Sequence, residues 1–259
     1  MNYIDVQVFV CFAAEDRYAI VEPIVYHLNN YGIHTWYDRR ALVMGDNRIE
    51  KNLIEGATKC RYALTIISKH TENSKCAMEE LSIIEQRYRN NNVTVFPVLY
   101  EIAPDDLPQK LLWIKEVIFK EADRQSGSRQ VCNHVACRIT NDIITETKCN
   151  CKTIQDIVNL SQISPELTTV QFLLKCYLKV DHANLNSRIT LLYAVYVFMI
   201  NEGSMPNNST TRMITQLFDR MFSETSLNLM VDYRELWLLE NSICILFDHY
   251  TAFCTESNM

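Results

Sequence analysis

The sequence has no excess of positive charge. Its 31 Asp and Glu residues outnumber its 25 Lys and Arg residues, which gives a formal net charge of −6. Surfaces that bind nucleic acid or anionic lipid are usually basic. We therefore expect no nucleic-acid or membrane partner, and instead a small ligand whose charge is met by a few local side chains.

Long apolar runs and a targeting segment are also missing. The longest apolar stretch, from Leu191 to Ile200, is about half of the roughly 20 residues that span a bilayer. The N-terminus has no charged segment followed by an apolar core, as a secretory signal would have. These absences predict a cytoplasmic protein.

Spacings that indicate disulfides or metal sites are lacking, although the chain has ten cysteines. A free thiol inside an apolar run behaves as a small hydrophobic side chain, and this applies to Cys11, Cys60, Cys176, Cys244 and Cys254. The spacings of Cys132 to Cys137 and of Cys149 to Cys151 are not diagnostic of structural zinc. Because the predicted compartment is cytoplasmic and therefore reducing, we expect no disulfides. We also expect no bound metal and no cofactor.

What the first half does have is a regular alternation of strand and helix patterns. Apolar runs predict strands at 6–12, 33–37, 62–67, 93–99 and 113–119, and helical periods predict helices at 16–28, 49–57, 74–88 and 129–145. This alternation is typical of a parallel sheet covered by helices on both faces. We predict an α/β domain with a flavodoxin-like, five-stranded parallel sheet over residues 1–147.

The second half has only helical periods. Helices are expected at 153–162, 165–181, 186–202, 208–224 and 228–254, with apolar residues such as Phe172, Leu173, Cys176 and Tyr177 at core spacing. We predict a separate all-α bundle over residues 153–259.

A polar turn follows each of the first three predicted strands. These turns contain Glu15-Asp16, then the segment from Asp38 to Gly45, then the segment from Ser68 to Ser74. In open parallel sheets, ligands bind at the carboxyl ends of the strands. The three turns therefore predict the position of a ligand site.

In their order and spacing these segments resemble a TIR (Toll/interleukin-1 receptor) domain over residues 5 to about 145. The first strand reads Val8-Phe9-Val10-Cys11-Phe12, the second ends in Trp36-Tyr37-Asp38, and the third ends in Ile66-Ile67-Ser68. The loop after Asp38 is similar to the family's BB loop through Leu42, Gly45 and Ile49. A phospho-receiver domain shares the layout but needs an aspartate where Ser68 stands, so that interpretation fails.

Many TIR domains cleave NAD, and the resemblance implies this activity here, as in bacterial antiviral enzymes of the Thoeris kind. The family's catalytic motif, S-x-W-C-x-x-E-L, matches Ser74 and Leu81 and places the catalytic acid at Glu80. Cys76 then stands at the tryptophan position. A competing register that matches the motif's cysteine to Cys76 would move the acid to Glu79, and the matches at Ser74 and Leu81 favour Glu80.

The proposed reaction requires a carboxylate of this kind. Cleavage of the nicotinamide–ribose bond passes through an oxocarbenium-like state, as glycoside cleavage does. A carboxylate held near the ribose in a water-poor cleft stabilises the developing positive charge. Nicotinamide leaves as a neutral molecule, so one glutamate can suffice. The alternative is that Glu79 and Glu80 have no catalytic role and lie on the charged face of a helix, where acidic residues in the first turns interact favourably with the helix dipole.

The resemblance also implies the substrate contacts, which would come from Phe12, Ala13, Ala14, Trp36, Asp38, Arg39, Arg40, Gly45, Ser68 and Cys76. Ala13 and Ala14 would act through their backbone. Arg39 and Arg40 suit pyrophosphate, because guanidinium groups bind phosphate in a bidentate manner. Trp36 and Tyr37 are both candidates to replace the aromatic group missing at Cys76, although an aromatic residue at the end of a strand is more often part of the core.

Family members often act only when assembled, so the expected partners are NAD, other TIR domains and further copies of this chain, with the helical bundle regulating assembly. NAD would be the substrate rather than a cofactor.

The alternative function is that of a non-enzymatic TIR adaptor, which would act through its BB loop. The missing tryptophan favours this alternative. Whether the product is ADP-ribose or a cyclic isomer stays open, because both arise from the same intermediate.

Overall fold

The computed structural model describes residues 7–38, 42–47, 49–147, 149–160, 165–202, 208–226 and 233–257. The chain divides into two compact units. Of the described residues, the sheet unit holds those in 7–29 and 33–135, and the helical unit holds those in 30–32 and 136–257. The division falls within helix α4 (Ser128–Thr147).

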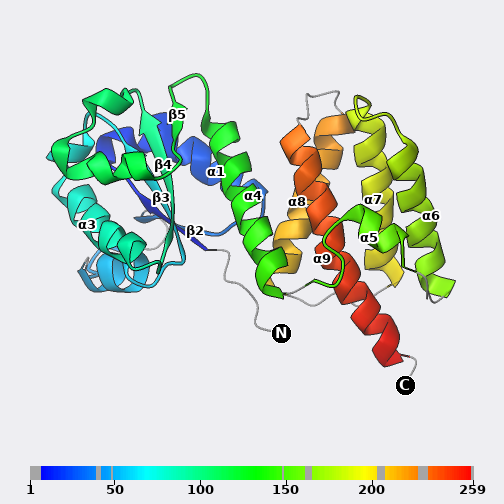
Figure 1. Ribbon diagram of the computed structural model, residues 1–259. Coiled ribbons are helices and arrows are strands. Elements are labelled where there is room, and N and C mark those ends of the chain that lie inside the picture. Colours follow the sequence, from blue (N-terminus) through cyan, green and yellow to red (C-terminus); the bar gives the residue numbers. More distant parts are fainter. Residues whose placement is uncertain are drawn as a thin grey trace. The chain divides into compact units, whose positions relative to one another are not determined.

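The sheet unit is built on five parallel strands (Figure 1). They are β1 (Val8–Cys11), β2 (Thr35–Trp36), β3 (Tyr62–Ile67), β4 (Thr94–Tyr100) and β5 (Lys120–Ala122), in the spatial order β2-β1-β3-β4-β5. The register pairs Val8 with both Thr35 and Tyr62. This order is the flavodoxin-like one, so the predicted fold class is confirmed.

Helices cover both faces of the sheet, which explains why every residue of β1 and β3 is buried. Helix α3 (Lys75–Arg89) packs with the π-helix η3 (Ile49–Ala57). Helix α1 (Glu22–Asn30) lies on the other side of the sheet (Figure 1) with the first part of α4, residues 128–135, where the Cys132 thiol donates to the Ile24 carbonyl oxygen at 3.5 Å. Short helical turns precede or connect these elements: η1 (Ala14–Asp16), η2 (Arg17–Val21), η4 (Thr71–Asn73), η5 (Pro104–Asp106) and η6 (Gln109–Glu116). The predicted apolar face of the first helix is confirmed, because Ile20, Ile24, Val25 and Leu28 are at most 1% exposed.

The fifth strand lies later in the chain than the sequence predicts. Trp113 and Ile114 belong to η6, and β5 begins only at Lys120. Both side chains are buried, Trp113 at 4% exposed and Ile114 at 0%. A short apolar run does not distinguish a strand from another buried segment, and here Trp113 and Ile114 are the buried side chains of a 3₁₀ helix, whereas Ile118 is 90% exposed.

The apolar pattern of residues 49–57 consists of Ile49, Leu53, Ile54 and Ala57, and it predicts only part of the buried face. Ala57 is buried, but Ile49 and Ile54 are 57% and 50% exposed, and Asn52 and Gly56 are buried in their place. The apolar pattern fits a helix of 3.6 residues per turn, but η3 is a π-helix with wider i→i+5 turns. The wider turn brings a different set of side chains onto the core.

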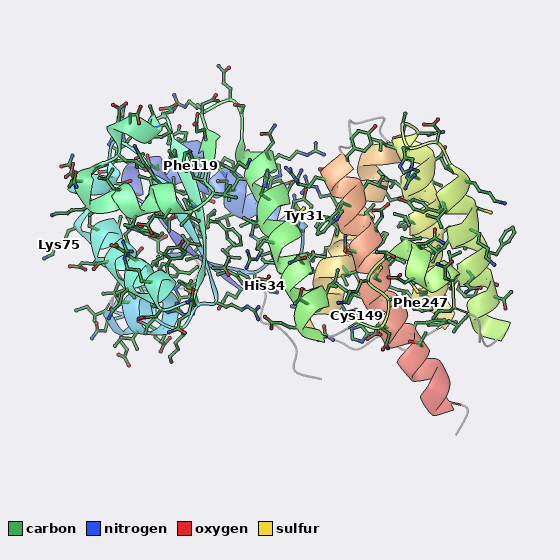
Figure 2. All side chains as sticks on the ribbon, in the orientation of Figure 1. Tyr31, His34, Lys75, Phe119, Cys149 and Phe247 are labelled. Atoms are coloured by element: carbon green, nitrogen blue, oxygen red, sulfur yellow. The ribbon has the colours of Figure 1, made fainter. Side chains whose placement is uncertain are left out.

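The helical unit contains α5 (Ile154–Val158), α6 (Pro165–Lys179), α7 (Leu185–Glu202), α8 (Ser209–Ser226) and α9 (Tyr233–Ser257). Tyr177 is 0% exposed, and Phe247, which Figure 2 labels, is 3% exposed. Phe172 is 63% exposed, contrary to expectation, because the neighbouring Gln171 takes the buried position and donates to the carbonyl oxygen of Ile157 at 2.9 Å.

A buried polar network ties three helices of this unit together. Arg188 of α7 is 3% exposed. It donates to the Tyr177 hydroxyl of α6 at 2.6 Å and to Glu240 Oε1 of α9 at 3.2 Å. The arginine is thereby paired, as a buried charge must be. Across the described ranges, no helix combines the length and apolarity needed to cross a bilayer.

Candidate functional site

The polar turns that follow β1, β2 and β3 meet at one edge of the sheet, as the sequence predicts. The Ser68 hydroxyl, after β3, donates to Asp16 Oδ2, after β1, at 2.6 Å. Arg17, also after β1, reaches Asp38, after β2. The parallel topology produces this convergence, since all strands present their carboxyl ends on the same side.

Asp16 and Ser68 form a buried pair at the base of this edge. Their side chains are 1% and 2% exposed. Burial raises the pKa of Asp16 above its ordinary value, although the hydrogen bond from Ser68 works in the opposite direction. Ser68 also accepts a hydrogen bond from the backbone N–H of His70 at 3.0 Å. Ser68 therefore braces the turn between β3 and α3.

Arg17 holds the start of the BB loop, and the sequence analysis does not single it out. Its guanidinium group binds Asp38 in a bidentate manner, with two distances of 2.7 Å, and donates to the Tyr37 hydroxyl at 3.1 Å. It also lies 5.1 Å from the centre of the Phe12 ring. The hydrogen bonds to Asp38 raise the pKa of Arg17, so this residue is a permanent cation.

Tyr37 completes this cluster. Its hydroxyl donates to Glu22 Oε1 at 2.6 Å. Burial, with this hydrogen bond as the next cause, raises the pKa of Tyr37 to about 12. Two of the predicted substrate contacts, Phe12 and Asp38, are thus joined through Arg17.

Glu80 lies on the face of α3 that packs onto the sheet. The helix begins after Ser74, whose hydroxyl accepts from the backbone N–H of Ala77 at 3.3 Å, as an N-cap residue does. Ala77 and Leu81 are buried on the same side. The Glu80 side chain is only 5% exposed. A buried carboxylate needs hydrogen-bond partners.

Asn52 of η3 is one such partner, and the sequence analysis does not predict it. Its Nδ2 donates to Glu80 Oε1, and its Oδ1 accepts from Trp36 Nε1 at 3.4 Å. Asn52 is 7% exposed. The sequence holds no distinct signal for Asn52, because Glu50, Lys51 and Glu55 are also polar in this segment and a helix of 3.6 residues per turn would not bury Asn52.

Cys11, the last residue of β1, lies beside the same carboxylate. Its thiol donates to the carbonyl oxygen of Ala77 at 3.6 Å. Burial, followed by the negative charge of Glu80, raises the pKa of Cys11 well above its ordinary value. The group beside Glu80 is therefore a neutral thiol and not a thiolate.

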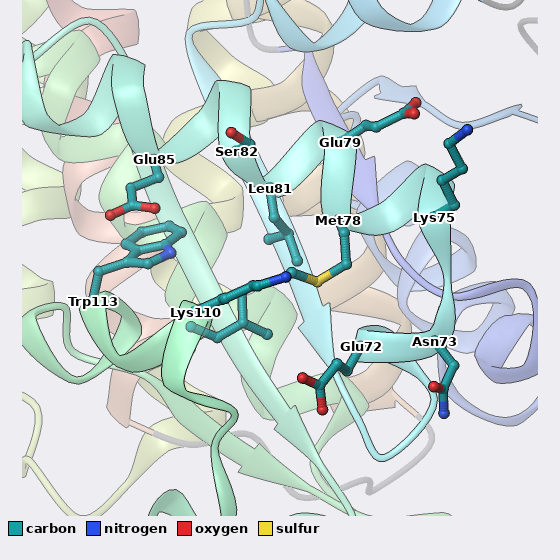
Figure 3. A pocket seen from close by; sticks show the side chains of 11 residues that line it. Glu72, Asn73, Lys75, Met78, Glu79, Leu81, Ser82, Glu85, Lys110 and Trp113 are labelled. Carbon is teal, nitrogen blue, oxygen red and sulfur yellow. The ribbon is translucent and has the colours of Figure 1, made fainter.

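Glu79, the competing candidate, faces a different surface. It lines a pocket of about 750 Å³ between α3, η4 and η6. Figure 3 shows its carboxylate at the rim of this pocket, together with Lys75, Met78 and Trp113. Glu80 does not line this pocket. The two neighbouring acids are thus separated by the turn of the helix.

The remaining predicted residues are distributed around the edge. Ala13 is buried, and its carbonyl oxygen accepts from the Asp16 N–H at 3.0 Å, whereas Ala14 is exposed. Cys76 and Gly45 are exposed, and Gly45 has φ +104°. Arg39 and Arg40 lie outside the described residues. Within the described ranges, no cluster of three or more His, Cys, Asp or Glu side chains is suited to a metal ion.

Comparison with known proteins adds a family assignment for this part of the chain. Residues 8–131 match the TIR domain family model. The NAD(+) hydrolase TcpC of Escherichia coli is 33% identical over 100 residues, which are 38% of this chain and 32% of TcpC. The NAD(+) hydrolase TcpA of a Theionarchaea archaeon is 27% identical over 39% of this chain and 30% of TcpA.

A further relative carries a different activity in its name. The 2′ cyclic ADP-D-ribose synthase BtTIR of Bacteroides thetaiotaomicron is 28% identical over 38% of this chain and 34% of BtTIR. The chain therefore matches about a third of the length of each of these relatives. Among solved structures, the TIR domains of an activated Roq1 resistosome match 55% of this chain and 74% of that chain, with a TM-score of 0.36 and 24% identity.

Proposed function

Because residues 8–131 of this chain are a TIR domain, we propose that the protein cleaves NAD at the nicotinamide–ribose bond. Relatives with this domain are named as NAD(+) hydrolases and as a cyclic ADP-ribose synthase. The products would be nicotinamide and either ADP-ribose or a cyclic isomer, released as an immune or stress signal.

The observation that carries this proposal is the environment of Glu80. Its carboxylate is 5% exposed, lies beside the end of β1 and accepts a hydrogen bond from a buried amide. In such a water-poor position, a fixed negative charge stabilises an oxocarbenium-like state far more than it would in water. Glu79 lines the outer pocket and is only partly buried.

The cluster around Arg17 would support the rest of the substrate. By holding Asp38, Arg17 fixes the residue at which the BB loop begins. We propose that Arg39 and Arg40, which follow in the chain, bind the pyrophosphate of NAD. The exposed Ala14, next to Phe12 and Ala13, would line the ribose side through its backbone.

The test is direct. Concentrated protein is incubated with NAD, and nicotinamide is quantified by chromatography for the wild type, Glu80→Gln and the matched control Glu79→Gln. We expect Glu80→Gln to lose at least about 100-fold in rate, comparable to the loss of one charge-stabilising group, and Glu79→Gln to stay within about twofold of wild type. Equal losses in both variants, or a loss only in Glu79→Gln, would contradict the assignment.

A second function is favoured by one observation. Cys76, at the tryptophan position of the motif, is exposed, so the aromatic platform expected beside the substrate is missing. A TIR adaptor that binds other TIR domains through its BB loop would need no such platform. A wild-type protein that releases no nicotinamide at any concentration, but binds a TIR domain, would favour the adaptor.

A further inference from the structure

We propose that Asn52 is a positioning residue that orients the Glu80 carboxylate for the reaction. This inference rests on the proposed NAD-cleaving function and adds a residue from a second element, η3, to the site. Asn52 does not touch the substrate in this proposal. It acts through Glu80.

The hydrogen bond joins two residues that are 28 positions apart in the sequence and belong to different elements, η3 and α3. Asn52 Nδ2 donates to Glu80 Oε1, and both side chains are buried, at 7% and 5% exposed. A glutamate side chain has several rotatable bonds, so without a fixed partner it samples several rotamers. The amide therefore holds the carboxylate in one orientation before NAD arrives, which is the condition for electrostatic preorganisation.

Trp36 determines which end of the Asn52 amide faces Glu80. The indole Nε1–H is a donor only, and it lies 3.4 Å from Asn52 Oδ1. The oxygen end of the amide is thereby directed toward Trp36, and the nitrogen end is left for the carboxylate. The reversed amide would present one oxygen to another and lose both hydrogen bonds. Trp36 is accordingly a support for Asn52.

Gly56 allows this arrangement to be tight. A Cβ atom at position 56 would lie 2.7 Å from Phe9 Cε2 and 2.9 Å from Trp36 Nε1. Only glycine lets η3 approach Phe9 and Trp36 this closely, and the same approach brings Asn52 within reach of Glu80. The site therefore depends on backbone packing as well as on the side chains that touch one another.

The test compares NAD cleavage by the wild type, Asn52→Ala, Asn52→Asp and Trp36→Phe, with the exposed Asn73→Ala as control. We expect both Asn52 variants to lose about 10- to 100-fold in kcat, because a small misplacement of a reacting group has effects of this size, while KM for NAD stays within about twofold. Trp36→Phe, which keeps a ring beside Gly56, should lose less. Asn73→Ala should behave as wild type.

The pH profile separates positioning from a general loss of structure. A donated hydrogen bond favours the ionised carboxylate, so its removal should move the acid limb of kcat/KM to higher pH. Asn52→Asp should move it furthest, because it also adds a like charge. An unchanged or higher kcat in Asn52→Ala would overturn the inference, and so would a fall in kcat with an unmoved acid limb.

Failure of the proposed function can be told apart from failure of this inference. A wild type that releases no nicotinamide contradicts the proposed function. The bond itself is then tested in urea unfolding with Asn52→Ala, Glu80→Ala and the double variant. Coupled residues give non-additive changes, and additive changes would overturn the inference.

Discussion

At the scale of single residues, position 76 departs most clearly from the TIR motif. Cys76 lies one helical turn before Glu80 and is exposed, so a larger side chain fits there without displacing the core. Replacing it by tryptophan should restore an aromatic surface for NAD. Base–aromatic stacking contributes about 1–3 kcal/mol, and at the lower end of that range KM for NAD should fall roughly fivefold.

The matched control for Cys76→Trp is Ser82→Trp, an exposed position of the same helix that lines the outer pocket. Steady-state kinetics with NAD would compare the two variants with wild type. Equal changes in KM for both variants, or no change for Cys76→Trp, would count against a substrate surface at position 76.

Asp16 gives a prediction on pH and stability. Its pKa is raised above 3.8, chiefly by burial, so the folded protein binds more protons than the unfolded chain between that value and the raised one. The free energy of unfolding therefore falls as pH increases through this window. Asp16→Asn keeps an acceptor for Ser68 but has no carboxyl group, so this fall in the free energy of unfolding should be absent.

The stability of Asp16→Asn relative to wild type should consequently increase as pH rises above about 4, and then become constant. Urea unfolding at a series of pH values, followed by tryptophan fluorescence, measures this difference. A difference that does not vary with pH would show that the charge of Asp16 carries no such penalty.

The residues of the site differ in how far the sequence can predict them. Glu80 stands as a candidate from the sequence alone because its motif, from Ser74 to Leu81, is local in the chain, and the structure shows that its side chain is buried. Asn52 and Arg17 could not be singled out, because their contacts are with residues distant in sequence. Asn52 contacts Glu80, and Arg17 contacts Tyr37 and Asp38. A pattern of local periodicity does not contain such pairings.

At the scale of elements, the same distinction holds. The predicted third strand, 62–67, agrees with β3 residue by residue, because a short run rich in aromatic and β-branched residues between polar turns is typical of a strand. The helix predicted from Ser74 begins at Lys75, because its N-cap is a local signal. The π-helical geometry of η3 and the helical turn at η6 follow from packing. The apolar pattern alone therefore places the exposed Ile49 and Ile54 on the buried face of η3, and it predicts a strand where η6 lies.

Gly56 provides the test at this scale. Gly56→Ala places a methyl group against Phe9 and Trp36, and overpacking of this kind costs about 1–3 kcal/mol. Since alanine is otherwise the better helix former by about 1 kcal/mol, the net loss of stability should be modest. The displacement of η3 should nevertheless separate Asn52 from Glu80, so NAD cleavage should fall more than stability does.

Urea unfolding and the nicotinamide assay on the same preparation measure both effects. Glu50→Ala, an exposed position in η3, is the control and should change neither. Gly56→Ala with wild-type activity would mean that the close approach of η3 is not needed for the site.

At the scale of the whole molecule, the burial of Glu80 raises the question of how NAD reaches it. In a single chain the carboxylate is 5% exposed, so the site must open for the substrate to bind. We propose that association of several copies, assisted by the helical unit, stabilises the open form. Binding that favours one of two states shifts the population toward it.

Specific activity should then rise with protein concentration, and it should do so over the same range in which light scattering detects oligomers. The measurement uses the full chain, with nicotinamide release and molar mass determined on the same dilution series. Glu80→Gln should assemble like wild type yet remain inactive, since Glu80 is buried within one chain and acts after assembly. A constant specific activity from a strict monomer would contradict assembly-dependent opening. It would not contradict NAD cleavage, because the single chain would then be the active form and the binding of NAD itself would expose Glu80.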